Sequence, residues 1–270
     1  MAHKIYDNFF LSNEVEDQFN SHLNLQQFCT VDNSLVGEAG MKRKINVYKA
    51  TDGTQKLTMS VGNSKSIEVS YAEKEYEILL AQNRFEYYDE QAMIDPMLVP
   101  VGVRHMGTDM FNTVNADIFA EFDKASLSVK ATDYGFGTFA DAVAKLNLEE
   151  IEGVNIFGFV NAADMAEVRK ALKEDLKYVE SFSRNGYVGT VAGVNLYTKK
   201  DAVSGTIIIA TKKAVTLFNK KGTEIEQITK NARSEIAANT RLNTIFSRKY
   251  YLAALTDATK AVKITVTPSV

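Results

Sequence analysis

Residues 98–124 read LVPVGVRHMGTDMFNTVNADIFAEFDK, and apolar side chains recur in this stretch every three or four positions. That spacing is typical of one face of an amphipathic α-helix. Asp95 and Pro96, directly upstream, mark the helix start, and Pro100 moves the first turn further along. At about 1.5 Å per residue the helix is roughly 40 Å long, far above the ordinary length of about 11–12 residues. We therefore predict a spine helix whose apolar face contains Val103, Met106, Met110, Val114, Ile118 and Phe122, widened by Phe111 and Phe119.

Upstream of this helix the apolar pattern changes to period two, which indicates strands. Asp52–Gly53 is a hairpin-turn signal, and residues 62–64 form a second loop. An isolated hairpin is marginally stable and needs a neighbour, so we predict a projecting ribbon over 41–82 that lies on another surface. Residues 1–40 lack a long periodic face, and we expect an arm that also lies along something else. The alternating positions of the ribbon are Ile45 and Val47; Leu57, Met59 and Val61; Ile67, Val69 and Tyr71; and Tyr76, Ile78 and Leu80.

Downstream of the helix, strand and helix patterns alternate. Residues 154–160 read as a strand, Asn161 as a helix N-cap and residues 163–173 as a helix. Two further strands follow within 189–211, and 214–228 is a helix or a pair of strands. Period-two alternation returns over 242–266, so we expect the chain to end in an antiparallel sheet that packs against the spine helix, with the middle domain inserted between them.

The stretch DYGFGTFADAV, residues 133–143, places Gly135, Gly137 and Ala140 in the G-x-G-x-x-[GA] spacing of a dinucleotide-binding loop. Such a loop follows a buried apolar strand, whereas the segment before it is short and half polar. Thr138 and Asp141 resemble a capping box, so we interpret the glycines as a flexible entry to a short helix. A nucleotide-binding enzyme that uses Gly135 to Ala140 stays open as a weaker alternative.

Other catalytic signals are missing from the sequence. The histidines are scattered, and neither H-x-x-x-H nor C-x-x-C spacing occurs, so no metal site is predicted. Cys29 is interpreted as a small apolar residue rather than a nucleophile. His105 and Asp109 are interpreted as an exposed pair one helical turn apart rather than an acid–base couple. We predict no catalytic, cofactor-binding or metal-binding residues, and no enzyme.

Charge is unevenly distributed along the chain. The net charge is −3, but segments 1–40 and 75–95 are acidic whereas 41–74 and 212–263 are basic. These blocks are either solvated faces or segments that meet across subunit boundaries. A pI of about 5.8 gives weak support for specific nucleic-acid binding. No apolar run approaches the roughly 18 residues of a membrane span, and the start lacks a secretory signal, so we expect no membrane association and a cytoplasmic origin.

Several segments, taken in order, carry a resemblance to a known family. They are NFFLSNEVEDQF (8–19), VDNSLVGEAGMKRKINVY (31–48), FEYYDEQAMIDP (85–96), GTVAGVNLYTKKD (189–201) and ARSEIAANTRLNTIFSRKYYLAALTDATKAVKI (232–264). In this order and spacing the sequence resembles the major capsid proteins of tailed bacteriophages that have the Hong Kong 97-type fold. The short forms from siphophages of Gram-positive bacteria are the most similar, and the likeness covers nearly all of the chain.

The resemblance implies an α+β fold in which each segment has a place in a shell. It implies self-assembly as hexamers and pentamers into an icosahedral head that encloses double-stranded DNA without sequence specificity. The implied partners are other copies of the chain, a scaffolding protein and the portal, and the implied location is the virion, after assembly in the host cytoplasm. An encapsulin-like nanocompartment shell, with a protein cargo, is the alternative. The implied parts are an N-terminal arm (1–40), an extended loop (41–82), a peripheral domain (83–133 and 231–270, with the spine helix 98–124) and an axial domain (134–230).

The resemblance also supports three finer expectations. The chain has no room for the N-terminal scaffolding region of many family members, so a separate scaffolding protein is implied. The covalent cross-link of the family's type member would join Lys56 or Lys65 to Asn231, Asn239 or Asn243. Deletion of residues 1–30 is expected to leave a soluble subunit that forms no closed shells.

Overall fold

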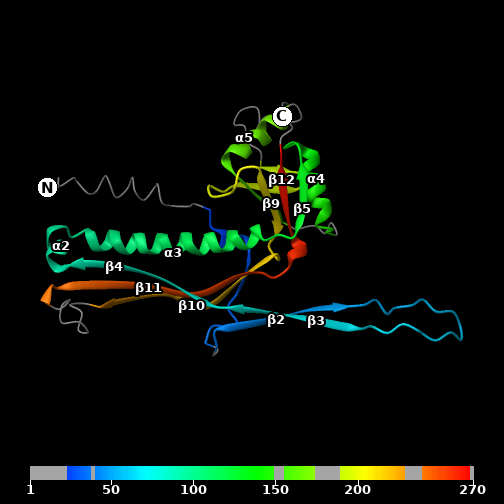
Figure 1. The fold of residues 1–270 in the computed structure, drawn as a ribbon, viewed down its shortest axis with the longest axis horizontal. Coiled ribbons are helices and arrows are strands. Elements are labelled where there is room, and N and C mark those ends of the chain that lie inside the picture. Colours follow the sequence, from blue (N-terminus) through cyan, green and yellow to red (C-terminus); the bar gives the residue numbers. More distant parts are fainter. Residues whose placement is uncertain (1–22, 38–39, 149–154, 174–188, 229–238, 268–270) are drawn as a thin grey trace.

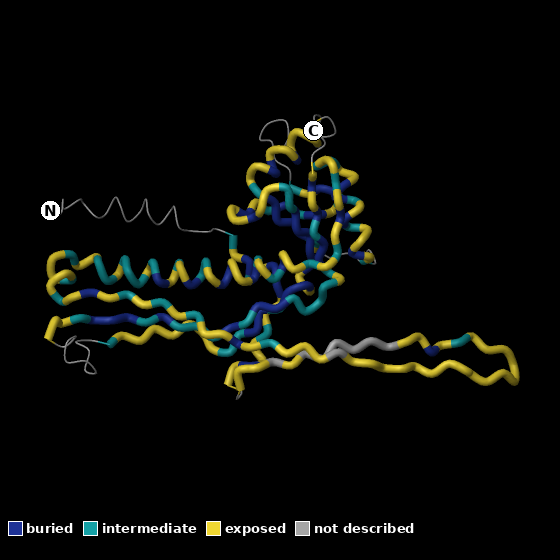
Figure 2. Tube along the Cα trace, viewed as in Figure 1, coloured by how far each residue is buried: buried dark blue, intermediate teal, exposed yellow. Residues whose placement is uncertain are grey.

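The computed structural model describes residues 23–37, 40–148, 155–173, 189–228 and 239–267. A long helix lies on a four-stranded sheet, and a six-stranded sheet with two helices stands over one end of that helix (Figure 1). A two-stranded ribbon projects beyond this end, along the longest axis of the molecule. The apolar core follows the long helix and continues into the six-stranded sheet (Figure 2).

The predicted spine helix is confirmed as α3, Leu98–Asp123. Its buried face consists of Met106, Met110, Val114, Asn115, Ile118 and Phe122, which includes all of the predicted apolar positions except Val103, Phe111 and Phe119, and these three are half-buried. A short helix that was not predicted, α2 (Asp89–Ile94), precedes it. Asp95 ends α2, and its carboxylate accepts a hydrogen bond from Met97 N at 2.9 Å, so this residue joins the two helices rather than capping α3 itself.

The four-stranded sheet has the order β1-β10-β11-β4. Its side chains alternate between two faces, and one face packs on α3, where Leu217, Tyr251 and Ala253 share a core cluster with Val114, Ile118 and Phe122. The expected packing on the spine helix is therefore confirmed for the strand Leu242–Leu255. Residues 215–228 form one strand with register shifts, not a pair of elements. The strands are β1 (Thr30–Asp32), β10 (Val215–Ile228), β11 (Leu242–Leu255) and β4 (Leu79–Tyr88).

The six-stranded sheet has the order β5-β12-β9-β6-β8-β7 and packs against helices α4 (Phe136–Lys145) and α5 (Ala162–Ala171). The predicted N-cap is confirmed, because Asn161 Oδ1 accepts a hydrogen bond from Ala163 N at 2.9 Å. The strands are β5 (Leu127–Ala131), β12 (Ala261–Val266), β9 (Thr206–Thr211), β6 (Ile156–Val160), β8 (Val194–Thr198) and β7 (Thr190–Val191).

The prediction that the last strand extends the sheet on the spine helix was wrong. A 3-10 turn, η2 (Ala258–Lys260), separates β11 from β12, and β12 pairs between β5 and β9 in the six-stranded sheet. Strands from 127–131 and 261–266, which the sequence assigned to the peripheral part, thus share a sheet with strands of the axial part. Period-two alternation shows which face of a strand is apolar, but it does not specify the partner strand.

The two sheets meet through a cluster of aromatic rings. Phe157 and Phe159 of β6 lie against Phe122 of α3, with ring centroids 5.7 and 5.6 Å apart. Phe28 completes the cluster at 4.9 Å from Phe157. Aromatic pairs at such distances contribute about 0.5–1.5 kcal/mol beyond the area that they bury. The axial part is therefore anchored on the C-terminal end of the spine helix.

The described part of the N-terminal segment belongs to the core of its own chain, whereas the sequence predicted an arm over 1–40. The 3-10 turn η1 (Leu25–Phe28) buries Leu25 and Phe28, and Cys29 is also buried. β1 then pairs in parallel with β10. Deletion of residues 1–30 would remove part of this core and destabilise the subunit, so truncation of an arm has to stop before Leu23. Residues 1–22 lie outside the described residues.

The ribbon is a hairpin of β2 (Lys42–Ala50) and β3 (Val69–Glu77), as predicted. Two details differ. Residues 57–61 form no strand, and the chain reverses there, with Val61 N donating to Thr58 O at 3.3 Å. Gly53 is not the turn but lies against the opposite side of the ribbon, where a Cβ atom would be 2.5 Å from Ile67 Cγ1. The hairpin ends before β4, so residues 79–82 belong to the four-stranded sheet.

Candidate assembly surfaces

Charged side chains pair across the two strands of the hairpin, in addition to the backbone pairing of β2 with β3. Lys42 Nζ lies 2.7 Å from Glu75 Oε1, and Lys44 Nζ lies 2.5 Å from Glu73 Oε1, across the two strands. The hydrogen bond to Glu75 raises the pKa of Lys42 and lowers the pKa of Glu75. Exposed ion pairs of this kind add little to stability, so these contacts alone do not make the ribbon stable.

The end of the ribbon is apolar and basic. Met59 is 99% exposed, and Leu57 and Val61 are exposed beside it. No acidic residue occurs between Gly53 and Ile67, whereas Lys56 and Lys65 are both exposed there. An exposed apolar group of this kind marks an interaction surface in a folded protein. We name residues 53–67 the hairpin tip.

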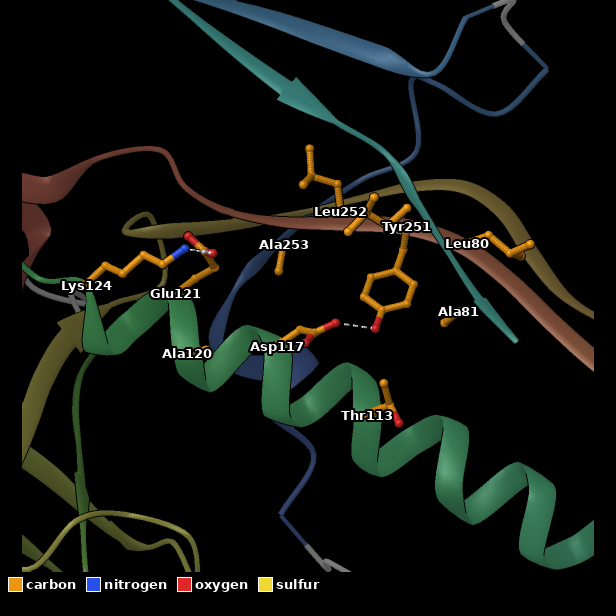
Figure 3. A pocket seen from close by; sticks show the side chains of 11 residues that line it. Leu80, Ala81, Thr113, Asp117, Ala120, Glu121, Lys124, Tyr251, Leu252 and Ala253 are labelled. Atoms are coloured by element: carbon orange, nitrogen blue, oxygen red, sulfur yellow. Dashed lines mark hydrogen bonds and ion pairs between the residues drawn. The ribbon is translucent and has the colours of Figure 1, made fainter. Parts of the chain in front are cut away.

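A groove separates α3 from the beginning of β4 and the end of β11 (Figure 3). Its volume is about 490 Å³, and Leu79, Leu80 and Ala253 give it apolar walls. Tyr251 points into the groove from the sheet and donates a hydrogen bond to Asp117 of α3 at 2.5 Å. Burial, followed by this hydrogen bond, raises the pKa of Tyr251. The groove combines apolar walls with carboxylates on the helix.

A second apolar group lies at the opposite end of the molecule from the hairpin (Figure 1). Met93 and Ile94 of α2 are exposed, and Met97 is exposed beside them at the start of α3. Asp89 and Glu90 give this end acidic side chains. The long axis therefore runs from a basic apolar end to an acidic apolar end.

Some of the charged blocks meet within the chain. Lys42 of the basic segment 41–74 pairs with Glu75 of the acidic segment 75–95, and Arg241 Nη1 of the basic segment 212–263 lies 3.5 Å from Glu90 Oε1. These contacts show that part of the alternation is satisfied inside one subunit. Contact between charged blocks of different subunits stays a prediction.

The glycine stretch around Gly135 is a helix entry in the structure. Gly135 is the N-cap of α4, and its N–H donates to Asp133 Oδ1 at 2.8 Å. Thr138 lies inside the helix and donates to the same oxygen at 3.1 Å, so the predicted capping box with Asp141 is wrong. The carboxylate of Asp133 thus occupies the start of α4. In a dinucleotide-binding loop, the N–H groups at this position are free and bind a phosphate instead. The geometry disfavours the nucleotide-binding alternative.

The surroundings of the remaining reactive side chains favour structural roles over catalytic ones. Cys29 is buried, and burial raises the pKa of its thiol to about 11, which opposes a nucleophilic role. Asp109 accepts a hydrogen bond from Asn83 at 3.2 Å. His105 is half-buried one turn earlier on α3. Within the described ranges no group of histidine, cysteine and acidic side chains is placed to hold a metal ion. No described helix is both long and apolar enough to cross a membrane.

Asp164 is the one acidic side chain in the described part of the chain that is nearly inaccessible to solvent. Its carboxylate accepts hydrogen bonds from Tyr134 at 3.0 Å, Ser204 at 2.8 Å and Gly205 N at 2.8 Å. Burial, then the contact with Asp164, raises the pKa of Tyr134 to about 12. The buried carboxylate is satisfied by these donors and ties α5 to two loops.

The residues named for a covalent cross-link are dispersed. Asn243 is buried and donates to Asp89 Oδ1 at 2.6 Å, whereas Asn239 is exposed and Asn231 lies outside the described residues. Lys56 and Lys65 lie at the hairpin tip. Among the described members of this set, the structure brings no lysine and asparagine together within one subunit, and a cross-link between subunits stays a prediction.

Comparison with known proteins supports the resemblance. No protein-family model matches the sequence. The chain is 24% identical over 257 residues to the major capsid protein of Staphylococcus phage phiMR11, and the alignment covers 93% of this chain and 90% of that protein. The mature capsid of bacteriophage PhiM1 has a TM-score of 0.69 at 10% identity, covering 90% of this chain and 86% of that one. A virus-like particle from Pyrococcus furiosus has a TM-score of 0.60 at 11% identity, covering 96% and 100%.

The fold match covers about nine-tenths of the chain. The resemblance to tailed-phage major capsid proteins, which the sequence segments indicated, is confirmed by the named relative and by the solved capsids. The chain has the Hong Kong 97-type fold of tailed-bacteriophage capsid proteins.

Proposed function

We propose that this chain is the major capsid protein of a tailed bacteriophage and that copies of it assemble into the shell of the phage head. The observation that carries the proposal is the alignment with a relative named as a major capsid protein, which spans nearly the whole of both chains. The projecting hairpin and the exposed apolar ends of the molecule support it, because they are surfaces that a single subunit cannot cover.

The parts of the fold have distinct roles in this proposal. The hairpin tip lies across a neighbouring subunit, where Met59 and the residues beside it become buried. The six-stranded sheet and its helices meet at the centres of hexamers and pentamers, and the four-stranded sheet with α3 forms the wall between them. The closed icosahedral shell encloses double-stranded DNA, and a scaffolding protein and the portal take part in assembly. The role is structural and not catalytic.

A nanocompartment shell that encloses a protein cargo is the second candidate. The match to the Pyrococcus furiosus virus-like particle over the whole of that chain supports it, since the same fold serves both architectures. The sequence likeness to a phage protein favours the phage head. The two candidates differ in what the shell contains.

The test is to express the chain alone and together with candidate scaffolding proteins, and to measure the mass of the products by size-exclusion chromatography with light scattering. Negative-stain electron microscopy of the large fractions is expected to show capsomer rings or closed shells. A monomer under every condition would overturn the proposal. Closed shells that retain a host-cell or co-expressed protein, and form without any scaffold, would favour the nanocompartment.

A further inference from the structure

The methionines of the described chain divide into a buried and an exposed group. Methionine is a flexible apolar residue that commonly fills gaps in a protein core, so full exposure to solvent calls for an explanation. Met59 at the hairpin tip is the extreme case, since 99% of its surface is accessible. The buried group is Met106, Met110 and Met165, and the exposed group is Met41, Met59, Met93 and Met97.

A tight turn holds Met59 at the end of the hairpin. Thr58 O accepts a hydrogen bond from Val61 N at 3.3 Å, and Ser60 has a φ of 68°. This left-handed conformation lets the chain reverse within a few residues. Turns of this kind favour glycine, asparagine, aspartate and serine, and methionine has none of their advantages. Neither the turn nor the core requires Met59, so its apolar side chain is free to contact a surface outside the subunit.

The thioether of an exposed methionine reacts with peroxides. Hydrogen peroxide transfers one oxygen atom to the sulfur: the O–O bond breaks, an S–O bond forms, and the second oxygen leaves as water. The sulfur loses the two electrons that the peroxide gains, and the product is methionine sulfoxide. A methionine sulfoxide reductase reverses the reaction, with two thiols oxidised to a disulfide and the oxygen released as water. The oxidant has to reach the sulfur, so Met59 is the most accessible target in the described chain.

Oxidation of Met59 changes the surface of the hairpin tip and leaves the core unchanged. The sulfoxide oxygen is a hydrogen-bond acceptor placed between the exposed apolar side chains of Leu57 and Val61. In the free subunit water solvates this oxygen. Burial of the tip on an apolar surface would leave it unpaired, which should weaken the contact about tenfold or more.

We propose that Met59 is a reversible oxidation site, and that its conversion to the sulfoxide by hydrogen peroxide or a related two-electron oxidant prevents the hairpin tip from binding a second copy of the chain. Reduction of the sulfoxide restores the contact. The inference rests on the proposed function, because it concerns regulation of the tip that this function places on a neighbouring subunit.

The first test is a short treatment of the full-length folded chain with hydrogen peroxide, followed by peptide mass spectrometry. Met59 is expected to gain one oxygen atom at least about tenfold faster than Met106 and Met110, which are internal controls. Cys29 is buried and has a raised pKa, so it competes weakly for the oxidant. The urea midpoint should stay unchanged, because Met59 has no packing to lose. Equal rates at Met59 and the buried methionines would overturn the assignment.

The second test measures assembly by light scattering and electron microscopy before and after the same treatment. Treated wild type is expected to need a protein concentration about tenfold higher to form shells, and reductase treatment should restore the original value. Met59→Leu keeps an apolar side chain without a thioether, so its assembly should resist peroxide. Met93→Leu is the matched control and should remain as sensitive as wild type.

The outcomes separate this inference from the proposed function. Shells that form equally well from treated and untreated wild type would overturn the inference and leave the capsid role intact. The same would follow if Met59→Leu were as sensitive to peroxide as wild type. Untreated protein that forms no shells under any condition would overturn the capsid role, and with it the regulation.

Discussion

The hydroxyl of Tyr251, on the central strand β11, donates a 2.5 Å hydrogen bond to the carboxylate of Asp117 on α3. Tyr251 is buried whereas Asp117 is exposed, so the bond joins the core of the sheet to the solvent side of the helix. It fixes the position of the spine helix on the sheet at the groove shown in Figure 3. Both the stability of the subunit and its response to pH follow from this contact.

Replacement of Tyr251 by Phe is expected to lower the free energy of unfolding by about 1–2 kcal/mol at pH 7, because a hydrogen bond to a charged acceptor is lost while the ring stays packed. Urea unfolding measures the difference. Tyr71→Phe, on the exposed hairpin, serves as the control and should change stability by less than about 0.5 kcal/mol. An equal change in the two variants would contradict the role of the Tyr251–Asp117 bond.

The same pair predicts a dependence on alkaline pH. The pKa of Tyr251 is raised in the folded state, so its contribution to stability is complete below the unfolded pKa of about 10 and is lost as pH rises toward the folded value. The stability difference between wild type and Tyr251→Phe should therefore shrink between pH 9 and pH 11. Urea midpoints at several pH values measure it, and a constant difference over this range would refute the assignment.

Two glycines of α3 provide a matched pair of substitutions. A Cβ atom on Gly102 would lie 2.6 Å from the ring of Phe85, whereas one on Gly107 would meet nothing within 4 Å. Gly102→Ala is expected to destabilise the subunit by about 1–3 kcal/mol through overpacking. Gly107→Ala should stabilise it by about 0.5–1 kcal/mol, because alanine favours the helix. Thermal unfolding distinguishes the two signs, and the same sign in both variants would contradict the packing of β4 on α3.

Asn115 is expected to be the most sensitive polar position on the spine helix. Asn115→Ala leaves Leu25 N–H without its acceptor in a buried site and should cost about 2–3 kcal/mol. Thr113→Ala, at an exposed position two residues earlier, should stay within about 0.5 kcal/mol. Urea unfolding compares them. A loss below about 1 kcal/mol for Asn115→Ala would show that the N-terminal segment is held by other contacts.

The hairpin tip offers a test of assembly that leaves the subunit intact. Met59→Glu adds a charge at a side chain that is 99% exposed, so the urea midpoint should not change. If the tip is buried on a neighbouring subunit, the buried charge should prevent shell formation, because an unpaired charge is costly to remove from water. Light scattering and electron microscopy report the outcome, with Ser60→Gln as a neutral control. Normal shells from Met59→Glu would contradict burial of the tip.

Much of the local structure was predictable from the sequence, and the errors have a common origin. The spine helix was predicted from the spacing of Met106, Met110 and Val114, and the hairpin from alternation on either side of residues 51–68. The pattern over 57–61 alternates equally well but forms no strand, and Asp52–Gly53 is a turn signal where no turn occurs. Short-range patterns describe a preference, and the pairing of distant segments overrides it.

The candidate surfaces were less predictable than the elements that carry them. Met59 and Met93 are apolar residues that the sequence cannot distinguish from core residues, and only the structure shows them exposed. Leu25 and Cys29 show the opposite error. Their segment lacks a periodic apolar face, which suggests exposure, yet both side chains are buried. Exposure depends on which other segment covers a side chain, and a one-dimensional pattern does not contain that information.

The sequence by itself determined the long amphipathic helix, the hairpin, the α/β unit after residue 154 and the resemblance to tailed-phage capsid proteins, because each depends on residue spacing within one segment or on segment order. The tertiary structure alone decided that β12 joins β5 and β9 and that Asn115 holds Leu23 and Leu25. These contacts join residues that are far apart in the sequence, so their partners are set by how the segments pack. Periodicity shows that a face must be covered, and only packing decides what covers it.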